Sequence, residues 1–84
     1  LEQNYPNPFN PTTTIEYTMW LPGEAKLVIY DFSGREIETL LDNRQTPGDY
    51  LVEWNADGLA SGIYFYRLII DDQTVITRKM VLLK

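Results

Sequence analysis

The chain has 84 residues, 44% of them apolar, and a formal net charge of −5. That length allows one small domain with a modest core, and an acidic surface would repel the phosphates of nucleic acid and anionic lipid headgroups. The chain has no histidine and no cysteine, which excludes disulfides and thiolate metal sites and removes the commonest general base and thiol nucleophile. We therefore expect no nucleic-acid partner and no cofactor.

An extended segment opens the chain. Residues 4–12 hold three of the five prolines, and each proline biases the residue before it toward an extended conformation, which excludes a helix. We expect a lead-in over residues 1–12 and a single β-domain over residues 13–84. The absence of an initiator Met indicates a piece of a longer protein. The kinked centre of the lead-in consists of Pro6, Asn7 and Pro8.

The rest of the chain alternates between strand-forming runs and turn signals. Apolar residues at every second position indicate half-buried strands, and no segment has a convincing helical period. Residues 42–48 are rich in turn formers and are expected to form a loop. Such spacings without crossover helices indicate an all-β, antiparallel sandwich of six to seven strands. The expected strands are residues 15–21, 26–32, 35–41, 50–54, 63–70 and 74–83.

The phase within these runs predicts which side chains face the core. Trp54 falls in phase with neighbouring apolar residues and is assigned to the core, whereas Trp20 falls in phase with polar residues and is assigned to the surface. Tyr64 and Tyr66 share an apolar face, where each hydroxyl needs a hydrogen-bond partner if it is buried. Residues 26–32 are apolar on both faces, so we expect both to be covered.

No arrangement of the acidic residues favours an active site. Glu36 and Glu38 lie two apart on an expected strand and share a face, which makes them the one local pair that could act as paired carboxylates. A solvated strand face is the better interpretation, because nothing apolar surrounds them. The turn aspartates, Asp57, Asp71 and Asp72, lack the spacing of a calcium loop. We expect no catalytic residue, no metal ligand and no enzymatic activity.

Positive charge is concentrated at the end of the chain. The first 72 residues carry four basic and twelve acidic side chains, a net charge of −8, whereas the last twelve carry three basic and no acidic side chains, a net charge of +3. A terminal edge strand offers a partner both unpaired backbone groups and side chains. Lysines also protect ordinary edge strands against aggregation. Taken alone, the last six residues, Lys79 to Lys84, which we call the tail, favour that simpler interpretation.

Several sequence blocks occur together in one order. They are Leu1 to Thr13, Ile15-x-Tyr17, Leu21-Pro22, Val28-x-Tyr30-Asp31-x-x-Gly34, Gly48-x-Tyr50, Trp54, Ser61-Gly62-Ile63-Tyr64 and Lys79 to Lys84. Their combination closely resembles the C-terminal sorting domain carried by cargo of the bacterial type IX secretion system, the Por secretion system type A sorting domain, over essentially the whole chain.

The resemblance implies an immunoglobulin-like sandwich that follows an N-terminal cargo domain and acts as a non-catalytic secretion signal. It also implies partners and a route: periplasmic transit, capture by the type IX outer-membrane translocon with its shuttle and sortase-like components, and a cargo that is secreted or displayed on the cell surface. Residues that carry the signal would be Lys79, Met80, Val81, Leu82, Leu83 and Lys84.

Within that signal, the phase of the strand predicts that Met80 and Leu82 pack inward and leave Lys79 and Lys84 to meet a partner. A terminal edge strand of this kind also predicts weak self-association. Elsewhere in the matching blocks, we expect an architectural role for the two Gly-x-Tyr units, in which glycine permits the turn that enters an aromatic strand. These residues are Gly48, Tyr50, Gly62 and Tyr64.

Two other functions are open at this point. Trp20 with neighbouring tyrosines could form an aromatic platform for sugar rings, as in a carbohydrate-binding module of a secreted enzyme. A purely structural spacer would share the same tyrosine-rich strands but would tolerate extra residues after Lys84.

Overall fold

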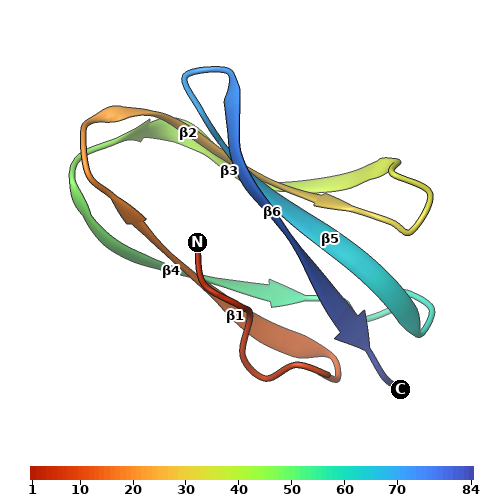
Figure 1. Cartoon of the computed structure of the whole chain (residues 1–84). Helices are drawn as coiled ribbons and strands as arrows, with labels where there is room; N and C mark the ends of the chain where they lie inside the picture. The colour runs from red at the N-terminus through yellow and green to blue at the C-terminus, as the bar shows by residue number, and fades with distance from the viewer.

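In the computed structural model, which describes all 84 residues, the chain forms six strands and no helix (Figure 1). The strands make two antiparallel sheets, one of order β1–β4 and one of order β3–β2–β5–β6. This is the antiparallel, immunoglobulin-like sandwich expected from the sequence, and the structure contains no helix that could span a bilayer. The strands are β1 (Thr12–Met19), β2 (Gly23–Tyr30), β3 (Glu36–Gln45), β4 (Gly48–Asn55), β5 (Gly62–Ile70) and β6 (Gln73–Leu82).

The core lies between the two sheets and is built from the alternating inward residues of the strands. Trp54 is 2% exposed, as its phase predicts, while Trp20 is 85% exposed beyond the end of β1. Every buried side-chain nitrogen and oxygen has a hydrogen-bond partner. The largest fully buried side chains are Trp54, Tyr17, Tyr66, Ile15, Met19, Leu27, Ile29, Leu68, Met80 and Leu82.

Strand β2 lies in the middle of the larger sheet, between β3 and β5, which is why its sequence is apolar on both faces. Leu27 and Ile29 reach the core, and Val28, on the opposite face, is also buried. The expected cover on both faces is confirmed for Val28 but is wrong for Phe32. That ring is 74% exposed because β2 ends at Tyr30 and Phe32 lies in the following turn.

Strand β3 is longer than its composition predicts. The expected loop over residues 42–48 is wrong for its first part, because β3 continues to Gln45 and only Thr46 and Pro47 separate it from β4. Asp42 pairs with Lys26 and Arg44 pairs with Glu24 in the β2–β3 ladder. Polar residues suit this position because β3 is an edge strand whose side chains reach water, so polarity here indicates exposure and not irregular backbone.

Aspartates organise the two hairpin turns of the larger sheet. Asp31 Oδ1 accepts hydrogen bonds from the backbone N–H groups of Ser33 and Arg35 at 2.9 and 3.0 Å, which closes the β2–β3 turn. Asp71 and Asp72 have φ angles of 51° and 64° and form the two-residue turn between β5 and β6. Aspartate tolerates this left-handed conformation better than most residues, so the turn signals seen in the sequence have a direct structural counterpart.

Candidate functional site

The C-terminal part of β6 has a buried face and an exposed face. Met80 and Leu82 have no exposed surface and lie in the core, as the phase of the strand predicts. Lys79 and Lys84 are exposed, and Leu83 is 55% exposed. Neither of the two ion pairs in the molecule involves the tail, so its ammonium groups face water. The inward side chains hold the strand in place while the outward ones stay accessible.

The outer edge of β6, on the side away from β5, is not free. The backbone N–H of Phe9 donates to Val81 O at 3.0 Å, and the N–H of Leu83 donates to Phe9 O at 3.0 Å. The N–H of Val81 donates to Asn7 Oδ1 at 2.9 Å, and Gln3 Nε2 donates to Lys79 O at 2.7 Å. The expectation that the terminal strand offers unpaired backbone groups is therefore wrong for residues 79–83, because the lead-in already occupies them.

The same lead-in also bonds to the other sheet. Tyr5 and Thr14 of β1 exchange both backbone hydrogen bonds at 2.9 Å, and Glu2 N–H donates to Glu16 O at 2.8 Å. Because β1 and β6 are edge strands of different sheets, the lead-in closes the side of the sandwich where these two edges meet. In Figure 1 the lead-in is the red segment that begins at the N-terminus, passes β1 and loops back to enter it. We call this contact of residues 1–11 with β1 and β6 the seam.

Buried polar side chains anchor the seam from inside. The Tyr66 hydroxyl donates to Glu2 O at 2.7 Å and accepts from the backbone N–H of Asn4 at 2.7 Å. Asn4 is 2% exposed, and its side-chain amide donates to Thr13 Oγ1 at 2.9 Å. The Thr13 hydroxyl in turn donates to Pro6 O at 2.9 Å. A satisfied buried network of this kind specifies one path for a segment that has almost no regular structure.

One aromatic side chain links the lead-in to the core. Phe9 is 2% exposed, and its ring lies 5.8 Å from that of Trp54. Phe9 also forms a parallel bridge with Leu82, the only parallel pairing in the molecule. Its neighbours Pro6, Asn7 and Pro8 are exposed. The peptide bonds before all three prolines of the lead-in, Pro6, Pro8 and Pro11, are cis.

The two Gly-x-Tyr blocks share one geometry. Gly48 and Gly62 are the first residues of β4 and β5 and have φ angles of 151° and 155°, values that other residues rarely adopt. Two residues later, the hydroxyls of Tyr50 and Tyr64 each donate to a carbonyl four residues upstream, Thr46 O at 2.6 Å and Ala60 O at 2.7 Å. Each tyrosine thus stabilises, through its hydroxyl, the turn that glycine permits. This arrangement is the tyrosine corner of sandwich folds.

The shared carboxylate face expected of Glu36 and Glu38 is not formed. A register shift in the β2–β3 ladder sets Glu36 opposite Tyr30 and Glu38 opposite Ile29, which face different sides of the sheet. Glu38 Oε1 accepts the indole N–H of Trp54 at 3.1 Å. This carboxylate thus serves as the hydrogen-bond acceptor of the Trp54 indole, and no group of three or more acidic side chains is placed to share a metal ion.

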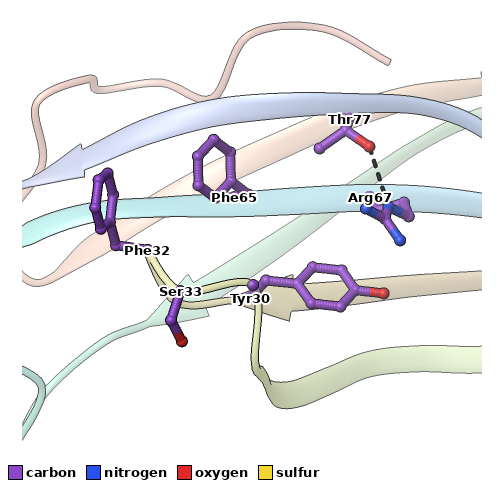
Figure 2. Close-up of a pocket in the computed structure, with 7 residues that line it drawn as sticks. Tyr30, Phe32, Ser33, Phe65, Arg67 and Thr77 are labelled. Carbon is purple, nitrogen blue, oxygen red and sulfur yellow. Dashed lines mark hydrogen bonds between the residues drawn. The ribbon is translucent and has the colours of Figure 1, made fainter.

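Two surface hollows lack the side chains that a binding site would need. One, of about 340 Å³, lies on the outer face of the larger sheet, where the Arg67 guanidinium lies 4.6 Å from the centre of the Tyr30 ring and Phe32 and Phe65 stand beside them (Figure 2). No carboxylate lines it. The other lies beside Trp20, and no tyrosine lines it. The tyrosines expected to extend a sugar platform around Trp20 are therefore elsewhere.

Burial changes the acidity of two tyrosines. It raises the pKa of Tyr17 to about 12, with the neighbouring Tyr50 adding to the rise and a hydrogen bond to Gln45 opposing it. Burial also raises the pKa of Tyr66, the hydroxyl beneath the seam. Hydrogen bonds from Ser33 and Arg35 lower the pKa of Asp31 in the β2–β3 turn. These shifts follow structural packing and do not converge on one reactive centre.

The local sequence pattern does not mark Asn4, Thr13 and the Tyr66 hydroxyl as a group. It predicts that a buried Tyr66 hydroxyl needs a partner, but it does not identify that partner as the backbone of Glu2 and Asn4. Only the Leu1 to Thr13 block, which is part of the family resemblance, marked this segment as more than a linker.

The chain matches the family of secretion system C-terminal sorting domains over residues 3–83. No curated protein and no solved structure matches it significantly. The matched range includes most of the lead-in, all six strands and most of the tail. The chain therefore belongs to the type IX secretion C-terminal sorting domain family, whose members direct export of an attached cargo across the outer membrane to the surface or the medium.

Proposed function

We propose that this chain is a non-catalytic sorting signal that the type IX translocon recognises as a folded surface centred on the C-terminal part of β6. The observation that carries the proposal is the two-sided tail: Met80 and Leu82 are locked in the core, while Lys79, Leu83 and Lys84 are exposed. A signal that must work with different cargo needs a surface whose shape does not depend on the cargo. Buried anchors on the same strand as the exposed residues provide such a surface.

The proposed recognition unit is the lead-in, residues 1–12, together with the sandwich, residues 13–84. Charge supports the tail as the surface that the partner contacts, because the tail is positive on an otherwise acidic chain and its cations form no ion pairs. A partner with an acidic and partly apolar docking surface would be steered to the tail and repelled by the rest of the domain. We further propose periplasmic transit, a shuttle and a sortase-like component as the finer steps of the route.

The experiment is export of a reporter that carries residues 1–84 behind a Sec signal in a host with a type IX system. Deleting residues 79–84 should leave the reporter in the periplasm, but that deletion also removes two core side chains. The double variant Lys79→Ala/Lys84→Ala keeps the core intact and should still reduce export. Lys26→Ala, a lysine of β2 outside the tail, is the matched control. Full export of the double variant would show that the tail cations are not read, and a wild-type fusion that stays inside would refute the function.

A further inference from the structure

The outer edge of β6 is a docking site for an extended segment, and the protein's own lead-in fills it. Residues 3–9 contribute the four hydrogen bonds described above to the backbone of Lys79, Val81 and Leu83. Outside that range, the Arg78 side chain of β6 also donates from Nε to Leu1 O at 2.8 Å. We propose that residues 3–9 are a displaceable strap, and that the export machinery gains the β6 edge by putting an extended segment of its own in their place. This inference rests on the proposed function.

The strap is held at separate points and not by a continuous ladder. It makes one isolated bridge to β1, at Tyr5 and Thr14, and one to β6, at Phe9 and Leu82. Its prolines have no N–H to donate, and most of its residues are exposed, including Tyr5 at 80%. By contrast, β5 and β6 are paired along almost their whole length. The strap can therefore open without breaking the β5–β6 ladder.

The backbone groups and the apolar pocket that the strap leaves behind would determine which kind of segment can bind in its place. Val81 presents one N–H and one C=O, and Leu83 one N–H, all directed toward the position of the strap. The pocket that holds Phe9 is apolar and is lined in part by Trp54. The fitting partner is thus a protein segment that runs parallel to β6, with an aromatic or large aliphatic side chain for the pocket and an amide acceptor two residues before it.

Exchange of one strand for another preserves the backbone hydrogen bonds at the edge, but it also withdraws the Phe9 ring from the core and breaks the bonds of Asn4 to Tyr66 and Thr13. The incoming segment must therefore fill the Phe9 pocket as well as the edge, and it must bind there more tightly than the strap does. A filled edge also protects the domain from pairing with other chains before it reaches the translocon, which an open β6 would not. Lys79 and Lys84 lie beside the exchanged segment and stay exposed in the strapped state, so charge-steered encounter can precede the exchange.

The first test locks the strap. Asn10 and Leu83 follow the paired residues Phe9 and Leu82, both are exposed, and the chain has no other cysteine to compete. In the reporter fusion, the variant Asn10→Cys/Leu83→Cys, once shown to be oxidised by its mobility without reductant, should be exported roughly tenfold less than either single-cysteine variant. A membrane-permeant reductant should restore export. The single variants control for the loss of each side chain.

Equal export of the oxidised and single-cysteine forms would overturn the strap while leaving the sorting function intact, because the wild-type fusion would still be exported. Failure of the wild-type fusion would instead refute the function itself.

The second test needs no disulfide. In hydrogen exchange of the free chain, the amides of Val81 and Leu83 should exchange about tenfold or more faster than those of β2, through a local opening. Asn7→Ala should accelerate Val81 further, and Asn10→Ala, which removes no hydrogen bond to β6, should not. Exchange of Val81 and Leu83 only at the rate of the β2 amides would show that the strap opens only with global unfolding.

Discussion

The two halves of β6 belong to one edge strand and pair with the same neighbour, β5. They differ in the other contacts that hold them in place. The half near Gln73 belongs to a hairpin tip that projects from the sandwich (Figure 1), and Val75 there is 56% exposed. The half from Arg78 onward has Met80 and Leu82 in the core and the lead-in along its outer edge. How firmly an edge strand is held therefore depends on the segments that cover it and not on its own strand-forming sequence.

The largest effect should come from removing the aromatic anchor of the covered half. Phe9→Ala should lower the free energy of unfolding by about 3 to 5 kcal/mol, because it leaves a cavity beside Trp54. For a domain this small, that loss approaches the whole stability. The matched control is Phe32→Ala, an exposed ring that should change stability by less than about 0.5 kcal/mol. Urea unfolding measures both, and equal losses would mean that Phe9 does not anchor the seam.

Alkaline pH should produce the next largest effect. Burial raises the pKa of Tyr17 to about 12 and also raises that of Tyr66. Unfolded tyrosines ionise near pH 10, so above that value the unfolded chain binds fewer protons than the folded one and stability falls as pH rises through the folded pKa. For Tyr17 the loss is on the order of 2 kcal/mol.

Urea unfolding between about pH 9 and pH 12 tests this in wild type and in Tyr17→Phe. The variant removes the contribution of a residue in β1, so the loss that remains reports partly on Tyr66 beneath the lead-in. A wild-type stability that stays constant above about pH 10 would contradict the prediction.

A loss of similar size should follow from removing one hydroxyl under the seam. Tyr66→Phe leaves the buried N–H of Asn4 and the carbonyl of Glu2 without their partner, which should cost about 1 to 3 kcal/mol. Tyr64→Phe removes a single bond to Ala60 O and is the matched control. The test compares the free energies of unfolding of the two variants. If Tyr64→Phe lowers the free energy as much as Tyr66→Phe does, the lead-in network contributes no more to stability than a single hydrogen bond.

The smallest effect is expected in the uncovered half of β6. Val75→Thr replaces an exposed side chain at the register shift with a residue of the same shape, and should change stability by less than about 0.5 kcal/mol. It should also leave the export of a reporter unchanged. A clear loss of stability would mean that the projecting hairpin tip contributes to the fold more than its exposure indicates.

The sequence alone predicted an antiparallel sandwich of six to seven strands, of which six form, together with the core position of Trp54 and the inward phase of Met80 and Leu82. The sandwich follows from the spacing of strands and turns without crossover helices, and the inward positions follow from alternation within one strand, which is a local property. The tertiary structure decided the length of β3, whose polar residues 42–45 suit a solvated edge as well as a loop. It also decided the exposure of Phe32, because the end of β2 is set by pairing.

Most of all, the tertiary structure decided what covers the tail. Asn4 meets Tyr66 across 62 residues, and Val81 meets Asn7 across 74. No local pattern encodes such pairings, because hydrogen bonds between distant segments depend on which edges the two sheets leave open. An apolar strand flanked by lysines indicates a C-terminal segment to which a partner could bind. Only the folded chain shows that the backbone of that end is already bonded to the segment with which the sequence begins.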